Sequence, residues 1–376
     1  MTLLTRRRFA SLAAAAGLAA GCAPRGAITM ASPPPGLDGT IAHIVVATSR
    51  REVEGQPIFT RARATPPTFA TFDVWVPPEH ALGSVTFPEK QPPNFATDFV
   101  TLGARRLSGE AAFIRAVNDS LAANPQYEGR ASLFVHGYNT NFAEGLYRHA
   151  QIYTDYGKRA APVQFAWPSA ASAKGYVYDR ESVLYSRDAL EQTIAALART
   201  NAREINLIAH SMGCLLMMET LRTMARIGYP EVFSRINAVL LLSPDIEIDV
   251  FRIQAPPVIA RGVPIFVVVS TRDRALMLAM MVRAERTPRV GSISSPEELG
   301  IDDVTVIDLS NVNAGGGMGH FALARSPELI ELLRGLRENG IDVLDESRQR
   351  GLFETGVSLI QRGADLLVEP LSPMGQ

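Results

Sequence analysis

The sequence has few of the residues that build metal sites. Of its 376 residues only two are cysteines and six are histidines. No two histidines have the spacing of a metal motif such as H-E-x-x-H, and there is no paired C-x-x-C. The cysteines, Cys22 and Cys214, are too few for a disulfide framework. We therefore expect neither a metal nor another cofactor.

The chain also lacks an excess of charge of one sign. It has 37 Lys and Arg against 38 Asp and Glu, and a dense basic block occurs only at the extreme N-terminus. Binding to nucleic acid requires a basic surface, so this class of partner is excluded. Hydrophobic residues make up 47% and charged residues 20%, which permits a sizeable buried core.

Long hydrophobic runs are missing as well. The longest near the N-terminus covers 9–20, which is about 18 Å as a helix and too short to cross a bilayer. Three arginines precede it and small residues follow up to Cys22, a pattern typical of a signal peptide over 1–22. "TRRRF" resembles a twin-arginine export signal.

"LAAGC" resembles a bacterial lipobox, in which Cys22 would become the lipidated first residue of the mature protein. We expect an exported protein, anchored by lipid on the periplasmic side of a bacterial membrane. The alternative is a plain signal peptide that releases a soluble periplasmic protein. Residues 23–40 are rich in Pro, Gly and Ala, which predicts a flexible tether.

After residue 40, short apolar runs alternate with helical patterns. Continuously apolar runs are typical of strands buried on both faces of a parallel sheet. This alternation predicts an α/β fold over 41–340, with a mostly parallel sheet of about eight strands and helices on both faces. The region 50–105 does not follow this alternation, and we expect it to form an antiparallel hairpin with a covering loop. A C-terminal helical extension is expected over 341–376. The expected strands are 42–49, 68–77, 131–137, 162–168, 205–210, 236–244, 264–270 and 304–309, and the expected helices are 109–124, 142–159, 182–199, 213–228, 274–284 and 324–338.

The run 205–210 ends in "AHSMG", which matches the G-x-S-x-G nucleophile elbow with Ala209 in place of the first glycine. Positions two before and two after the serine must be small, because larger side chains would clash with the strand and the helix. This geometry places Ser211 at the sheet edge as a nucleophile. The N–H of Met212, at the start of the next helix, can then donate to an oxyanion.

Other expected strands are also followed by candidate catalytic groups at their carboxyl ends, where ligands of such sheets bind. "HGYN" follows the run 131–137, and we expect the Tyr138 N–H as the second oxyanion donor. His320 is the only histidine after Ser211, which makes it the expected general base. The acid is Asp273, after 264–270, or alternatively Asp245, after 236–243.

These residues together resemble the α/β-hydrolase superfamily. The strings "FVHGYNTNF", "LIAHSMG", "SPDIEIDVF" and "STRDRAL" are similar to those of a bacterial family of exported or lipoprotein hydrolases of unknown function. The resemblance covers roughly 40 to 335 and implies a Ser–Asp–His triad, here Ser211, Asp273 and His320. It implies no defined substrate.

Trp167, Tyr176 and Tyr178 are the expected substrate-lining residues, the two tyrosines in a loop near the active edge. The predicted function is a serine hydrolase that cleaves carboxylic esters, of small molecules or lipids, through an acyl-enzyme. An acyltransferase or amidase with the same triad is the alternative within enzymes. The alternative outside enzymes is a non-catalytic scaffold lipoprotein. The oligomeric state is not predicted.

Overall fold

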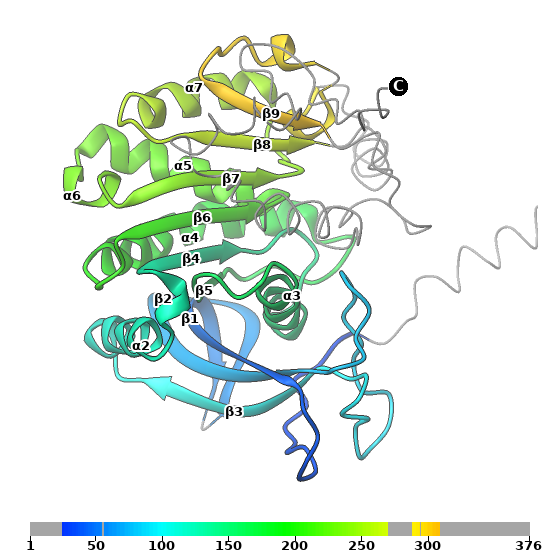
Figure 1. Cartoon of the computed structure of the whole chain (residues 1–376). Coiled ribbons are helices and arrows are strands. Elements are labelled where there is room, and N and C mark those ends of the chain that lie inside the picture. Colours follow the sequence, from blue (N-terminus) through cyan, green and yellow to red (C-terminus); the bar gives the residue numbers. More distant parts are fainter. Residues whose placement is uncertain (1–24, 55, 270–287, 294, 309–376) are drawn as a thin grey trace, which may run out of the picture.

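The computed structural model describes residues 25–54, 56–269, 288–293 and 295–308. In these ranges the chain forms one nine-stranded sheet in the order β3-β2-β1-β5-β4-β6-β7-β8-β9 (Figure 1). β1 (Thr40–Val53), β2 (Gln56–Val76) and β3 (Val100–Leu107) are connected antiparallel. β1 pairs in parallel with β5, and all later strand pairs are parallel. The predicted α/β fold with a mostly parallel sheet is confirmed.

The parallel part brings together strands that are far apart in the sequence. Its members are β4 (Arg130–Val135), β5 (Ala161–Ala166), β6 (Glu204–His210), β7 (Ile236–Leu242), β8 (Ile265–Val269) and β9 (Val304–Asp308). β5 and β8 are buried at every residue, as their mainly apolar sequences predict, and the one polar residue of the two strands, Gln164, is buried as well. The carboxyl ends of these strands all reach the same edge, at the arrowheads in Figure 1.

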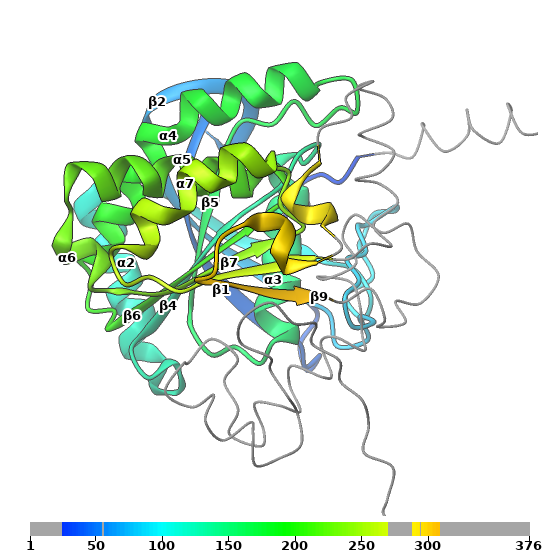
Figure 2. The same ribbon diagram turned by 90° about the horizontal axis from the view of Figure 1, so that it is seen from above.

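Helices cover both faces of the sheet (Figure 2). α3 (Phe142–Asp155) packs against β1, β2 and β5, with Leu146 and Tyr147 fully buried. The opposite face carries α2 (Glu110–Ala123), α4 (Tyr176–Ala198), α5 (Met212–Ile227) and α7 (Ile248–Ile259), and the short α6 (Pro230–Phe233) packs against α4. α5 is central, because it contacts α4 on one side and α7 on the other. The helix that follows Ser211 is therefore firmly held by its neighbours.

Four elements differ from the sequence-based expectations. β2 begins twelve residues earlier than expected, and β3 was expected as loop. β2 accommodates its prolines because the pairing with β1 is irregular between Thr48 and Arg50, and strands tolerate proline at such bulges. α7 was not predicted, since it holds Pro256 and Pro257 in its interior. α4 starts at Tyr176, so the expected loop over 176–181 is wrong.

The segment 25–40 lies against the domain instead of acting as a free tether. Ala31 N–H donates to the Thr101 carbonyl and Thr101 N–H donates to the Thr29 carbonyl, at 3.1 and 2.9 Å. Thr29 N–H also donates to the Tyr147 hydroxyl. The segment gains order from backbone bonds to β3, which its Pro-rich composition does not reveal. The predicted signal peptide 1–22, with Cys22, and the extension 341–376 lie outside the described residues.

Candidate active site

Ser211 stands between β6 and α5 in a backbone conformation that few residues adopt. Its φ is 52° and its ψ is −121°, and it is the residue that caps α5. Such strain in a non-glycine residue typically persists where function requires it. The turn is held by its neighbours, because Ser211 N–H donates to the Leu242 carbonyl at 2.9 Å and Asp245 N–H donates to the Ser211 carbonyl at 3.2 Å. The strand-to-helix elbow predicted from "AHSMG" is present.

The elbow is pressed against the loop after β4. A Cβ on Gly213 would lie 2.4 Å from the His136 carbonyl oxygen and 2.9 Å from that of Val135. A Cβ on Gly137 would lie 3.0 Å from the Ser211 Cβ. Gly213 is therefore required by the close approach of backbone atoms, and Gly137 by the close approach of the His210 and Ser211 side chains. The two segments expected to carry the oxyanion donors, 137–138 and 211–212, lie directly beside each other.

Met212 is the first residue of α5, and its backbone belongs to the positive end of the helix. The first N–H groups of a helix have no partner within the helix, which favours an anion beside them. Tyr138 follows Gly137, and its hydroxyl donates to the Ala173 carbonyl. This bond ties the loop after β4 to the segment that leads into α4.

His136 braces this loop from inside. Its ring stacks on Trp167, with 5.0 Å between ring centroids, and its two nitrogens contact the carbonyls of Gly137 and Trp167. Burial lowers the pKa of His136 to about 3, so the ring is neutral near pH 7 and donates only one of these two bonds. Trp167 is fully buried and donates its indole N–H to the His136 carbonyl at 2.7 Å. It was expected to line a substrate site, but it supports the loop from the core.

The two tyrosines expected at the active edge point in different directions. The Tyr176 hydroxyl donates to Asp245 Oδ2 at 3.1 Å, and its ring packs edge-on to Tyr138. Tyr178 instead donates to the Arg61 carbonyl, and the Arg63 guanidinium lies 4.6 Å from its ring centroid. Residues two apart in a helix face nearly opposite sides, so Tyr178 turns toward β2. Only Tyr176 lies beside the residues that follow β7.

Asp245 is buried beside the elbow in a charged cluster that the sequence pattern did not predict. Arg289 Nε lies 3.7 Å from Asp245 Oδ1, and its terminal nitrogen lies 3.4 Å from Glu247. Asp245 and Arg289 are each 2% exposed. Arg289 was missed because it is 44 residues away along the chain and belongs to no motif. The structure thus places Asp245 next to Ser211 and gives its carboxylate a guanidinium partner.

Asp273 and His320 lie outside the described residues. The structure therefore brings together Ser211, Met212, Tyr138 and Asp245, and the expected base and first-choice acid stay predictions from sequence order. Within the described ranges, no helix has the length and apolar character needed to cross a membrane. No cluster of three potential metal ligands occurs in the same ranges.

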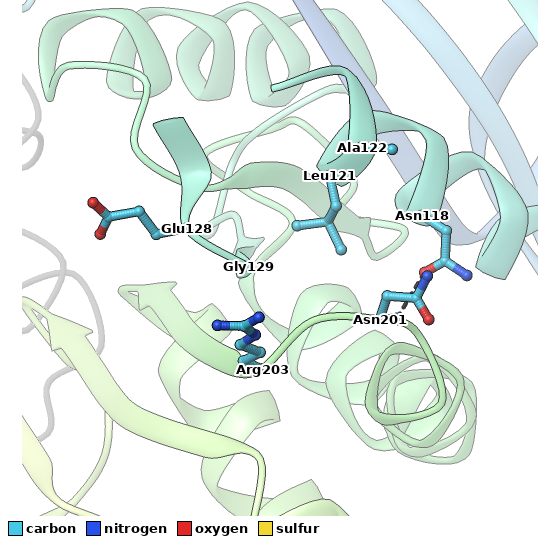
Figure 3. A pocket seen from close by; sticks show the side chains of 7 residues that line it. All are labelled: Asn118, Leu121, Ala122, Glu128, Gly129, Asn201 and Arg203. Carbon is cyan, nitrogen blue, oxygen red and sulfur yellow. Dashed lines mark hydrogen bonds between the residues drawn. The ribbon is translucent and has the colours of Figure 1, made fainter. Parts of the chain in front are cut away.

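A cavity of about 480 Å³ lies at the other edge of the sheet, away from these residues. Leu121, Gly129 and Arg203 are among the residues that line it, near the amino ends of β4 and β6 (Figure 3). Asn118 Oδ1 accepts a hydrogen bond from the Asn201 N–H beside it. Because ligands of such sheets bind at the carboxyl ends of the strands, this cavity is not the reaction site.

Weak similarities to solved structures were found. Lipase B of Aspergillus fumigatus is 14% identical over 61% of this chain and 57% of its own, with a TM-score of 0.34. Phospholipase PlaB from Legionella pneumophila is 14% identical over 60% and 61%, with a TM-score of 0.36. A fungal esterase structure from Rhizomucor miehei is 13% identical over 90% and 92%, with a TM-score of 0.31. The chain spans less than two thirds of the first two, and scores this low transfer neither activity nor substrate.

No curated protein matches the sequence. A family model does match, over residues 110–337, which is more than half of the chain. That range runs from the start of α2 past the last described strand and includes the elbow. The chain therefore belongs to the family described as alpha/beta hydrolase of unknown function (DUF900).

Proposed function

We propose that the protein is a serine hydrolase that cleaves carboxylic esters, with Ser211 as the nucleophile. The observation that carries the proposal is the elbow, in which Ser211 has a φ of 52° and lies against the Gly137 backbone. A serine in an ordinary turn needs neither this strain nor two glycines packed without space for a Cβ. Membership of an α/β-hydrolase family supports hydrolysis as the reaction class.

The reaction would proceed in two steps. Ser211 Oγ attacks the ester carbonyl carbon while His320 takes the hydroxyl proton, and the carbonyl oxygen becomes an oxyanion between the N–H groups of Met212 and Tyr138. His320 then gives the proton to the departing alcohol, which leaves an acyl-enzyme on Ser211. Water then attacks this ester while His320 takes its proton, and His320 returns the proton to Ser211 Oγ as the acid is released. An acceptor alcohol or amine in place of water would make the same site an acyltransferase.

The acid that orients His320 is Asp273 or Asp245 in this proposal. Asp245 is buried close to the elbow, which suits the role, but Arg289 lies beside its carboxylate. A cationic partner makes a carboxylate a weaker acceptor for an imidazolium. We therefore retain Asp273 as the first choice, on the basis of its position after β8 in the sequence.

The proposed place of action is the periplasmic side of a bacterial membrane. The N-terminal sequence pattern supports export, and Cys22 in "LAAGC" supports a lipid anchor. Metabolic labelling with an alkyne fatty acid tests this anchor. Label that is present in the full chain and absent in Cys22→Ala supports it, and equal label in both proteins contradicts it.

Fluorophosphonate labelling and p-nitrophenyl ester hydrolysis test the enzyme proposal in purified residues 23–376. Ser211→Ala and His320→Ala should each lower turnover by about 10⁴- to 10⁶-fold and abolish labelling at Ser211. Of Asp273→Asn and Asp245→Asn, the change with the larger loss of turnover identifies the acid. Folded protein that neither labels nor turns over would instead favour the scaffold lipoprotein.

A further inference from the structure

The loop after Tyr138 is held almost entirely by side chains from other parts of the chain. Asn139 has a φ of 53°, a left-handed conformation that an asparagine adopts only at some cost. The backbone N–H and carbonyl of Asn139 and of Thr140 all bond to side chains rather than to a strand or helix. Such a loop has a fixed shape only while those side chains are in place.

The inner partners are Asp179 and Ser169. Asp179 is fully buried in the first turn of α4, and its Oδ2 accepts the Asn139 N–H at 3.3 Å and the Ser169 hydroxyl at 2.6 Å. Its Oδ1 accepts the Ala170 N–H at 2.6 Å. Ser169 Oγ in turn accepts the Thr140 N–H at 3.2 Å. One carboxylate therefore organises the backbone of two separate loops.

Arg50, at the end of β1, is the buried cation of this group. It is 1% exposed and donates to the Thr140 carbonyl at 2.9 Å. Burial lowers the pKa of Arg50 to about 10, which still leaves the guanidinium charged at neutral pH. Its charge also interacts favourably with that of Asp179. A buried cation with an anion close by is far less costly than either charge alone.

The outer partner is Arg25, in the segment that precedes β1. Its guanidinium donates to the Asn139 carbonyl at 2.8 Å and to the Asn139 side chain at 2.9 Å, and it pairs with Glu144. Glu144 also accepts the Asn141 N–H within the capping box of α3. The backbone of Asn139 is thus held at its N–H by Asp179 from inside and at its carbonyl by Arg25 from outside.

We propose that Arg25, Arg50, Ser169 and Asp179 form a loop clamp that positions the Tyr138 N–H as an oxyanion donor. Asp179 holds the peptide that joins Tyr138 to Asn139, and this peptide follows directly on the Gly137–Tyr138 peptide, which carries the donor N–H and lies beside Ser211. The bond therefore limits rotation of the backbone at Tyr138, and with it the direction of the donor N–H. The clamp residues are positioning residues, since none of them touches the reacting atoms in this proposal. The inference rests on the proposed serine hydrolase function.

Misplacing an oxyanion donor affects the transition state more than the bound substrate, because the negative charge develops only during attack. Removal of one such donor typically lowers kcat by about 10²- to 10³-fold. A donor that is displaced rather than removed should cost about 10- to 100-fold, with KM nearly unchanged.

Asp179→Asn is the sharpest test of the clamp. The amide keeps the shape of the carboxylate but replaces one acceptor oxygen by an N–H₂ group, which then faces a donor whichever way it is turned. At least one of the bonds from Asn139, Ser169 and Ala170 must break. Asp188→Asn is the matched control, because Asp188 is exposed on the same helix.

The readouts are the rate constant of fluorophosphonate labelling, kcat and KM for a p-nitrophenyl ester, and hydrogen–deuterium exchange of the peptide over 136–142. Asp179→Asn should slow labelling and lower kcat by about 10- to 100-fold, leave KM within about threefold, and speed exchange of that peptide. Asp188→Asn should match the wild type in all three. Arg25→Ala, whose side chain is 42% exposed and whose loss leaves the core intact, should change the readouts in the same direction by a smaller factor.

Labelling of both Asp179→Asn and Arg25→Ala at the wild-type rate would overturn the clamp while leaving the hydrolase proposal in place. A rise in KM with kcat unchanged would also overturn it, because that pattern shows a role in substrate binding. A wild-type protein that does not label refutes the hydrolase proposal and the clamp's catalytic role together.

Discussion

Gly213→Ala tests the packing on which the elbow depends. The added Cβ would lie 2.4 Å from the His136 carbonyl oxygen, whereas ordinary contacts of a Cβ begin at 3.4 Å. The obstacle is backbone at the end of β4, which cannot rotate away as a flexible side chain can. The start of α5 must therefore move by about 1 Å. A displacement of this size at a nucleophile costs about 10²-fold in rate.

The same strain lowers stability. Overpacking of this kind typically costs about 1 to 3 kcal/mol, so the free energy of unfolding of Gly213→Ala should fall by this amount. Urea-induced unfolding measures the stability, and fluorophosphonate labelling measures the activity at Ser211.

Gly145→Ala is the matched control for this substitution. Gly145 lies inside α3, also beside His136, but its Cβ would meet no atom closer than 3.4 Å. Alanine is the better helix former, so this variant should gain about 0.5 to 1 kcal/mol and keep its activity. Wild-type stability and labelling in Gly213→Ala would refute the argument that the end of β4 leaves no space for a Cβ at the elbow.

Three further predictions concern buried titratable groups. Asp245→Asn leaves the buried Arg289 guanidinium without this carboxylate. The free energy of unfolding, measured in urea, should fall by about 3 kcal/mol, and a loss below about 0.5 kcal/mol would show that the pair does not stabilise the fold. Burial lowers the pKa of His136 and of His149 to about 3 from 6.5, so both bind protons between pH 6.5 and 3 only in the unfolded chain. The free energy of unfolding should therefore fall as the pH falls through this window, by up to about 1.4 kcal/mol per pH unit for each histidine. If the free energy of unfolding of His149→Phe had the same slope against pH as that of the wild type, this expectation would be contradicted. Burial raises the pKa of the Cys214 thiol well above its ordinary value. The protein of residues 23–376 should therefore react with a disulfide reagent only after unfolding, and rapid reaction of the native protein would contradict this.

The parallel strands and the elbow could be predicted from the sequence because their signals are local. β5 and β8 are short, mainly apolar runs, and the spacing of Ser211 and Gly213 reflects steric limits within a few residues. The start of β2 could not be predicted, since its prolines depend on irregular pairing with β1, and β3 could not, since its polar residues depend on pairing with β2. α7 could not be predicted because it contains two prolines in its interior, where helices rarely have them.

The surroundings of the site were less predictable than its nucleophile. Arg50 and Thr140 are 90 residues apart in the sequence, and Arg25 and Asn139 are 114 apart. No periodicity or motif links such positions, because only the fold brings them together. The mistaken loop at 176–181 had a further effect, since Tyr176 and Tyr178 were expected to face one region and the helix separates them.

The bond between Arg25 and Asn139 also limits how the protein can be oriented at a membrane. Arg25 is three residues after Cys22, and three residues span at most about 11 Å. In a protein anchored through Cys22, the backbone of Arg25 would therefore stay within about one helix diameter of the lipid headgroups, with the loop after β4 beside it. Esters in that leaflet would reach the site by lateral diffusion, at the high effective concentration that a short tether creates.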